Sequence, residues 1–135
     1  MSDTMQHLRL THEGALRMVR AAVVKAVETE VPQCIAVVDD GGNLLAFVRM
    51  DGAKFLSIES SIRKAVTAAS GRAATGGIGA DVEMKLAHAT SGRLVNLKGG
   101  LPVVVEGIVV GGIGVGSGTG EQDLEVARAG LAALG

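Results

Sequence analysis

The chain has 135 residues, which suits a single domain over residues 1–135, and its 13 basic and 14 acidic residues give a formal net charge of −1. This balance, with no Trp or Tyr and only two Phe, excludes a basic nucleic-acid surface and a base-stacking platform. The lone Cys34 excludes an internal disulfide, and neither a signal-peptide layout nor a membrane-spanning apolar run is found, so we expect a cytoplasmic protein without membrane contact.

The first half of the chain predicts a helix and a hairpin. We expect residues 1–9 to form a flexible segment, followed by a helix with Thr11 as its N-cap, because apolar residues recur at helical spacing over 15–26. Two β-type runs follow, at 34–38 and 44–50, and the Asp, Gly and Asn residues between them predict a tight turn. The two strands should therefore pair antiparallel.

The second half predicts three helices and a second hairpin. Apolar residues from Phe55 to Ala69 form a helical stripe, residues 81–89 predict a short helix, and 91–100 predicts a loop with or without an edge strand. Strands are expected at 101–105 and 108–115, before a last helix that starts with a T-x-x-Q capping box. The order α-β-β-α-(α)-β-β-α indicates an α+β fold with an antiparallel sheet flanked by helices.

Glycine occupies every second position from Gly112 to Gly120. On an extended strand this period places all of these glycines on one face, which is bare backbone. Such a face allows a helix, a second subunit or a ligand to approach closely. The pattern alone leaves these alternatives open.

The segment after the last strand has the chemistry of an anion site. Ser117 and Gly118 lie where free backbone amides at the start of a helix would attract an anion. Glu121 and Asp123 in the same turn would repel a bare anion, so we expect a ligand that also carries a cation, or a carboxylate held by Arg49. A surface salt bridge, for instance to Asp51, is the alternative role for Arg49.

The three histidines lack the spacing of a structural zinc site. His12, in the first turn of the first helix, could ligate iron or face solvent. His88 could line a pocket or interact with a helix dipole. Cys34 is expected to be a small buried apolar residue, and Lys64 could reach a cleft or extend along the surface.

Five segments form an ordered set that points to a family: 36–42 (AVVDDGG), 49–53 (RMDGA), 64–65 (KA), 99–102 (GGLP) and 114–123 (GVGSGTGEQD). Together they resemble the haem-degrading GlcG/HbpS-like family, which includes the C-terminal domain of PduO-type proteins. The resemblance implies a profilin-like fold and a homo-oligomer, commonly an octamer. It also implies haem as a possible cofactor, with His12 as the iron ligand and Gly114, Ser117 and Gly118 as cofactor-binding residues.

Three functions follow as hypotheses. The first is a small-molecule or cofactor-binding protein that binds or degrades haem. The second is an enzyme of organic-acid or aromatic catabolism, an isomerase, deaminase or hydrolase that acts by proton transfer on a carboxylate substrate. Its candidate catalytic residues are Arg49, Asp51, His88, Glu121 and Asp123. The third is a non-catalytic oligomeric accessory protein.

Overall fold

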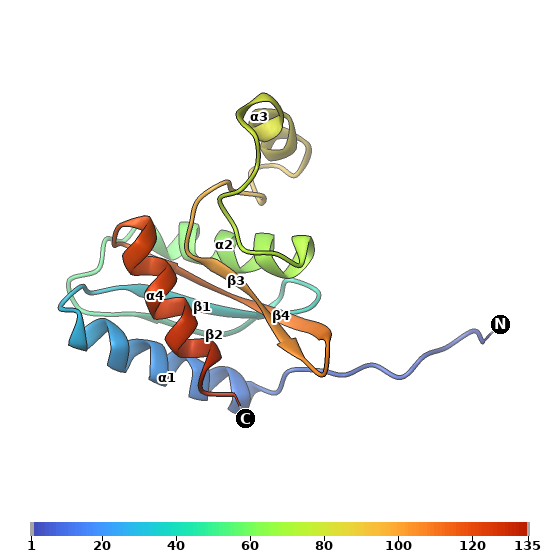
Figure 1. Ribbon diagram of the computed structural model, residues 1–135, viewed down its shortest axis with the longest axis horizontal. Helices are drawn as coiled ribbons and strands as arrows, with labels where there is room; N and C mark the ends of the chain where they lie inside the picture. The colour runs from blue at the N-terminus through green and yellow to red at the C-terminus, as the bar shows by residue number, and fades with distance from the viewer. Residues whose placement is uncertain (1, 135) are drawn as a thin grey trace.

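The computed structural model describes residues 2–134 and places four helices and four strands in them (Figure 1). Their bounds are α1 His12–Glu28, β1 Cys34–Asp39, β2 Leu44–Arg49, α2 Ser57–Gly71, α3 Ala80–Ala89, β3 Gly100–Val105, β4 Ile108–Gly116 and α4 Gly120–Leu131. The observed order confirms the predicted α+β fold, and 91–99 is a loop. No helix of the described residues is both long and apolar enough to cross a membrane.

The four strands form one sheet in the order β2-β1-β4-β3, and every neighbouring pair is antiparallel. The two hairpins predicted from the sequence therefore lie side by side, joined through their central strands β1 and β4. In this register Ile35 of β1 lies opposite Val48 of β2 and Val115 of β4. The sheet end that carries the first residue of β1 also carries the last residue of β4.

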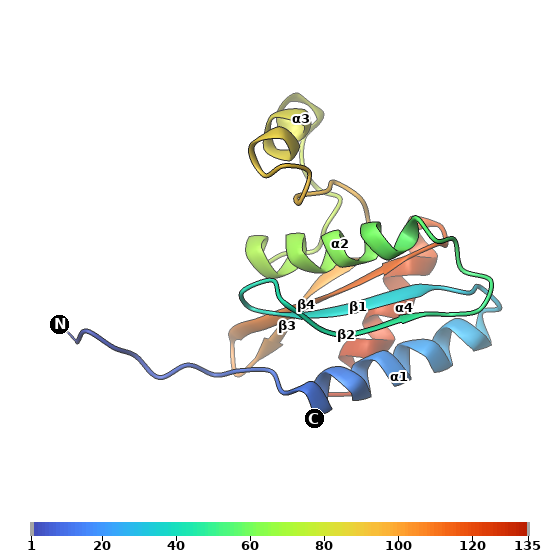
Figure 2. The ribbon, with the colours of Figure 1, turned by 180° about the vertical axis from the view of Figure 1, so that it is seen from behind.

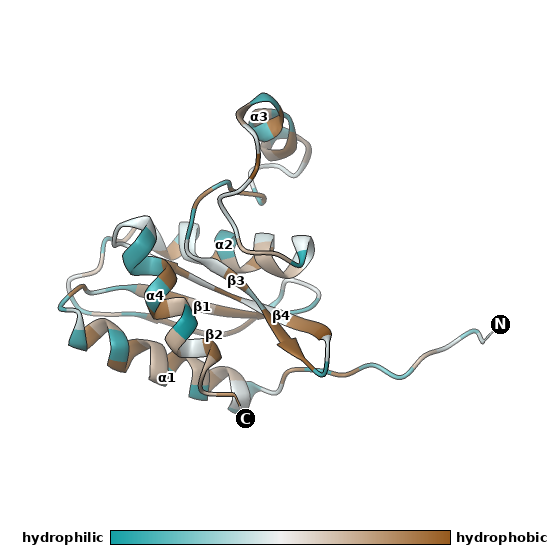
Figure 3. Ribbon diagram, viewed as in Figure 1, coloured by the Kyte–Doolittle hydropathy of each residue, from teal (hydrophilic) through white to brown (hydrophobic). Residues whose placement is uncertain are grey.

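Helices cover both faces of the sheet (Figures 1 and 2). On one face, α1 and α4 lie side by side over a core that includes Met18, Ile35 and Ile113, all fully buried. On the other face, α2 packs over a smaller cluster that includes Ala36 and Val38. Because side chains alternate along a strand, β1 supplies residues to both clusters, and the brown apolar colour is accordingly concentrated on the strands (Figure 3).

The alternating glycines of β4 face α2 of the same chain. A side chain on Gly112 would meet the carbonyl oxygen of Ala65, and one on Gly114 would meet that of Ser61. This close approach selects small residues on α2, and its buried residues are Ser57, Ser61, Lys64, Ala65, Ala68 and Ala69. The predicted apolar stripe on this helix began at Phe55. This first position was wrong, because Phe55 lies before the start of α2 and is 72% exposed.

Local signals at helix ends are confirmed. The Thr11 side chain accepts a hydrogen bond from the Gly14 amide at 3.0 Å and caps α1. Both hydrogen bonds of the capping box between Thr119 and Gln122 are present at the start of α4. The strand predicted at 108–115 is β4, Ile108–Gly116, one residue longer than expected, and the glycines at 118 and 120 lie beyond it, where the chain turns into α4.

The helix α3 stands apart from the rest of the fold. Figures 1 and 2 show it beyond α2, at the end of an arm formed by residues 72–99. None of its residues is buried. Residues 2–11 also lie outside the helices and strands. Leu10 packs against the core and the His7 ring contacts the Asp40 carboxylate, whereas the chain before them extends away from the body of the molecule in both views.

Candidate functional site

A cavity of about 290 Å3 lies at the sheet end where β4 stops and both α2 and α4 begin. It is lined by residues from five parts of the chain: Lys54, Ser57, Ser60, Lys64, Leu97, Lys98, Ser117, Gly118, Gly120 and Asp123. Three of these residues are lysines and three are serines, so the lining is mainly polar. We call it the Lys64 cavity.

The inner wall of the Lys64 cavity holds a buried ion pair. The Nζ of Lys64 lies 3.0 Å from Oδ2 of Asp123, and the two side chains are only 6% and 3% exposed. The same ammonium donates a hydrogen bond to the carbonyl oxygen of Val115 at 2.8 Å, which connects the end of β4 to α2. The pair therefore joins helices that cover opposite faces of the sheet.

Two glycines where β3 begins, Gly99 and Gly100, make this pairing possible. A Cβ on Gly99 would lie 3.0 Å from Nζ of Lys64 and 2.8 Å from Cβ of Asp123. A Cβ on Gly100 would lie 2.5 Å from the backbone carbonyl oxygen of Lys64. Gly99 also has a φ of 121°, a conformation that side chains disfavour. The absence of side chains at these two glycines thus leaves room for the Lys64 side chain to pass the end of the sheet and reach Asp123.

Opposing effects act on the pKa of the Asp123 carboxyl group. Burial raises its pKa above the ordinary value, although the Lys64 ammonium and the Gly118 amide, which donates to Oδ1 at 2.9 Å, favour the charged form. A carboxyl group with a raised pKa next to an ammonium can accept or donate a proton closer to neutrality than an exposed aspartate. Acid–base chemistry is therefore available at the cavity wall.

Ser117 forms the turn between β4 and α4. Its φ is 97°, which is rare for a residue with a side chain and costs backbone strain. Its hydroxyl oxygen accepts a hydrogen bond from the backbone amide of Lys54 at 2.9 Å, which connects this turn to the segment before α2. The strained turn places the Ser117 side chain in the cavity lining.

The outer part of the Lys64 cavity carries exposed charges. Nζ of Lys98 lies 2.7 Å from Oε1 of Glu121, and this contact lowers the pKa of the Glu121 carboxyl. The aliphatic part of Lys98 lies over Gly120, where a Cβ would be 3.1 Å from Cβ of the lysine. Lys54 is exposed and has no ion pair among residues 2–134. Exposed lysines therefore surround the entrance.

The structure brings together one group of the residues predicted from the sequence. Ser117, Gly118 and Asp123 line the Lys64 cavity, and Glu121 contacts Lys98 at its entrance. Gly114 lies nearby in sequence but beneath α2, where Ser61 covers it.

The other predicted residues lie elsewhere. Arg49 ends β2 at the same end of the sheet, opposite Cys34, but neither it nor Asp51 lines a described cavity. His12 is exposed at the start of α1, and His88 is exposed on α3. Cys34 is buried, as predicted. Within residues 2–134, no cluster of three or more His, Cys, Asp or Glu could hold a metal ion.

A larger cavity lies between α2 and the arm. Its volume is about 610 Å3, and it is lined mainly by small and apolar residues of 66–78 and 90–94. No histidine lines this or any of the other three described cavities. The described cavities of one chain therefore do not provide an enclosed haem site with a histidine ligand.

Sequence reasoning missed the lysines of the Lys64 cavity as site residues. Lys64 was expected either to reach a cleft or to extend along the surface, and Lys54 and Lys98 carried no signal. One signal was present: Lys64 shares a helix face with Ser57, Ser61 and Ala68, and such small residues match a glycine strand. A lysine on that face has to bury its ammonium group, which requires a partner.

Comparisons with known proteins agree on one family. A family model described as haem degrading protein HbpS-like matches residues 10–132. A 15.0 kDa protein of the dhaT-dhaS intergenic region of Citrobacter freundii is 38% identical over 136 residues, which cover 97% of this chain and 96% of that protein.

Two solved structures share the fold over nearly the whole chain. One is a double mutant of Streptomyces reticuli HbpS, with a TM-score of 0.88 and 38% identity over 100% of this chain and 93% of that one. The other is a PduOC:haem complex, with a TM-score of 0.86 and 30% identity over 94% of this chain and 96% of that one. These likenesses agree with the resemblance carried by the five sequence segments.

Proposed function

Because the chain belongs to the HbpS-like family of haem-degrading proteins, we propose that it is a small-molecule-binding protein and that the Lys64 cavity binds a small carboxylate. One observation carries this proposal: a cavity of about 290 Å3 combines three lysines and three serine hydroxyls around a buried ion pair. Its volume suits a ligand of a few carbon atoms and is below the usual range for drug-sized ligands.

The charges of the Lys64 cavity support an anionic ligand. Asp123 neutralises Lys64, and Glu121 partly neutralises Lys98, but the Lys54 ammonium at the entrance has no acidic partner within residues 2–134. A ligand carboxylate can accept hydrogen bonds from Lys54 and from the serine hydroxyls, and charge-assisted bonds of this type are the stronger ones. The role that the sequence suggested for Arg49 would then belong to Lys54.

Calorimetric titration with a series of linear mono- and dicarboxylates, from acetate to adipate, tests the proposal. We expect at least one member to bind, and Lys54→Ala to weaken its binding by about tenfold, the effect of losing one charge-assisted bond. Lys85→Ala is the matched control, since Lys85 is an exposed lysine of α3 outside the cavity lining. Equal weakening by both variants, or no binding of any acid, would refute the proposal.

Haem binding is the second candidate, and the haem complex of the similar PduOC structure favours it. In this chain His12 is the proposed iron ligand, and it is exposed in the first turn of α1. The large cavity under the arm lies on the α2 side of the sheet, whereas α1 covers the opposite face. His12 would therefore hold a haem at the surface, outside the described cavities.

Hemin titration followed in the Soret region tests this candidate. We expect the Soret band to shift with the wild type and not with His12→Ala. His88→Ala is the control, because His88 is also exposed but lies on α3. An identical shift in wild type and His12→Ala would remove the role of His12, and a shift in none of the proteins would remove haem as a ligand.

A further inference from the structure

A glutamine side chain is buried beside the Lys64 cavity without a partner. Gln33 directly precedes β1 and is fully buried, and neither its amide nitrogen nor its amide oxygen has a hydrogen-bond partner within residues 2–134. Its backbone is held in place, because its carbonyl oxygen accepts a hydrogen bond from the Met50 amide at 3.0 Å. A buried polar group without a hydrogen bond costs free energy, so this side chain requires an explanation.

The amide group of Gln33 lies beside the carboxyl group of Asp123. A Cβ on Gly118 would lie 2.7 Å from Nε2 of Gln33 and 3.0 Å from Oδ1 of Asp123, so both groups border the same point. Burial raises the pKa of Asp123, and the Gln33 side chain is one of the neighbours that oppose this rise. An amide can donate to a carboxylate through its nitrogen or accept from a protonated carboxyl group through its oxygen. Gln33 therefore suits a carboxyl group that changes its protonation state.

The buried ion pair has a second protonation state, in which neither side chain is charged. The Nζ of Lys64 lies 3.0 Å from Oδ2 of Asp123, so a proton can pass from the ammonium to the carboxylate along this hydrogen bond. Burial favours this transfer, because charged groups lose more hydration than neutral ones. The product on Lys64 is a neutral amine, which is the form of lysine that attacks carbonyl groups.

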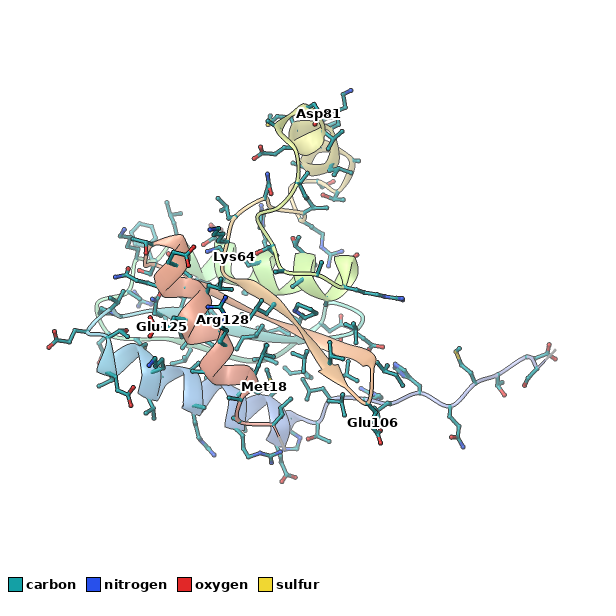
Figure 4. All side chains as sticks on the ribbon, in the orientation of Figure 1. Met18, Lys64, Asp81, Glu106, Glu125 and Arg128 are labelled. Atoms are coloured by element: carbon teal, nitrogen blue, oxygen red, sulfur yellow. The ribbon has the colours of Figure 1, made fainter. Side chains whose placement is uncertain are left out.

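The amine lies where a small molecule can reach it. Lys64 and Asp123 are both in the lining of the cavity, and Lys54 lies at its entrance. A ligand whose carboxylate is bound by Lys54 would extend toward the inner wall, so a carbonyl group in the same molecule can approach Lys64. Figure 4 shows Lys64 on the body of the molecule and Asp81 at the far end of the arm. Lysines of α3 are therefore remote from this chemistry.

We propose that Lys64 forms an imine with the carbonyl group of a short oxo acid, and that Gln33 is a positioning residue for Asp123 in this reaction. The inference rests on the proposed function, because Lys54 and the serine hydroxyls would bind the carboxylate of the same molecule. The cavity volume of about 290 Å3 limits the substrate to a few carbon atoms. The carbonyl group distinguishes this substrate class from small carboxylates in general.

The reaction balances with the groups of the cavity and needs no oxidant or reductant. Asp123 takes one proton from the Lys64 ammonium, and the neutral amine forms a C–N bond to the carbonyl carbon. The carbonyl oxygen takes one proton from that nitrogen and one from Asp123, and it leaves as water when the C=N bond forms. The protonated imine on Lys64 is again a cation that faces the Asp123 carboxylate. While Asp123 is protonated, it donates to the amide oxygen of Gln33, which leaves the lone pair of the amine available for attack.

Reductive trapping of the full chain tests the imine. The protein is incubated with sodium cyanoborohydride and with pyruvate, acetoacetate or levulinate, which place the carbonyl group at increasing distance from the carboxylate. We expect at least one acid to modify Lys64 at a rate about tenfold or more above that of Lys85, because the cavity holds the acid next to the amine. Lys85 is the internal control, since it is exposed on α3 outside the cavity lining. Mass spectrometry of peptides locates and quantifies the adducts.

Replacing Gln33 separates a positioning role from a purely structural one. We expect Gln33→Leu to fold, as checked by circular dichroism, because leucine removes the unpaired polar group. Its maximal trapping rate at Lys64 should fall about tenfold, the effect of losing one hydrogen bond. The acid concentration that gives half of the maximal rate should stay the same, because Gln33 does not line the cavity. An unchanged maximal rate, or an equal change in both quantities, would overturn the role of Gln33.

The imine and the proposed function fail in different ways. If an acid binds in the calorimetric titration but no oxo acid modifies Lys64 faster than Lys85, the imine is overturned and the cavity remains a binding site. The acid that binds most tightly in that titration should slow the modification of Lys64 and leave that of Lys85 unchanged, because it occupies the same cavity. Modification of Lys64 that this acid does not slow would overturn the proposed placement of the oxo acid.

Discussion

Lys64 and Asp123 show how a single buried residue can depend on another. Removing a charge from water costs several kcal/mol, which is repaid only when a partner and further hydrogen bonds compensate for the lost hydration. Here each side chain has the other, while Lys64 also bonds the Val115 carbonyl and Asp123 also accepts from the Gly118 amide. Each residue is therefore tolerated in the interior because the other is present.

We predict that Lys64→Met lowers the free energy of unfolding by about 3–5 kcal/mol, because Asp123 would keep a buried charge without a partner. The double variant Lys64→Met with Asp123→Leu should recover a large part of this loss, since no charge then remains buried. Urea unfolding of the wild type, both single variants and the double variant measures these changes. Losses that simply add in the double variant would show that the two side chains are not coupled.

Asp39 gives a prediction for the pH dependence of stability. Burial alone would raise its pKa, but hydrogen bonds from the Asn43 and Gly41 amides outweigh that effect and lower it. A lowered folded-state pKa means that Asp39 stabilises the fold above its unfolded pKa and loses this effect as the pH falls through the folded value.

We therefore expect Asp39→Asn to be less stable than the wild type at pH 7, by about 1 kcal/mol, because the amide oxygen is a weaker acceptor than the carboxylate. The difference should shrink as the pH falls below the ordinary aspartate range. Thermal unfolding of both proteins at a series of pH values measures it. A difference that stays constant down to strongly acidic pH would contradict the assigned role of the carboxylate.

At the scale of elements, the contact between α2 and β4 decides where the site lies. Because β4 has glycines on the face toward α2, this helix comes so close that its carbonyl oxygens occupy the space that side chains on β4 would need. This close packing fixes the rotation of α2 and so directs Lys64 toward the end of β4, where Asp123 lies in the first turn of α4. The glycines therefore serve packing within the chain and position the ion pair indirectly.

Gly114→Ala tests this packing. The added methyl group would meet the Ser61 carbonyl, so we expect a loss of about 3 kcal/mol or more in the free energy of unfolding, at the upper end of the range for overpacking. Gly71→Ala is the control on α2, because a Cβ there meets nothing within 4 Å and alanine is the better helix former. Chemical denaturation should give the two variants opposite signs, and similar losses would argue against the role of close approach.

The same elements show what the sequence could predict. The cap at Thr11 and the capping box of Thr119 and Gln122 depend on side chains that bond within a few residues, so their patterns are visible in the sequence. Lys64 and Asp123 are 59 residues apart, and their contact depends on how α2 rests on β4. Ser117, Gly118 and Asp123 were predicted because one short segment holds them, whereas the lysines reach the cavity from three other segments.

At the scale of the whole molecule, burial is distributed unevenly. The central strand β1 is buried along nearly its whole length, with Ile35 and Val38 fully buried, whereas α3 has no buried residue. Opening of a segment is easiest where few apolar contacts have to be broken. The backbone hydrogen bonds of β1 should therefore be among the most protected, and those of α3 among the least protected.

Hydrogen exchange of the full chain tests this difference. We expect exchange in Cys34–Asp39 to be slow and exchange in Ala80–Ala89 to be much faster, because few apolar contacts have to be broken to open α3. Mass spectrometry of peptides from the two segments measures both rates in one experiment. Equal protection of α3 and β1 would contradict the uneven distribution of burial.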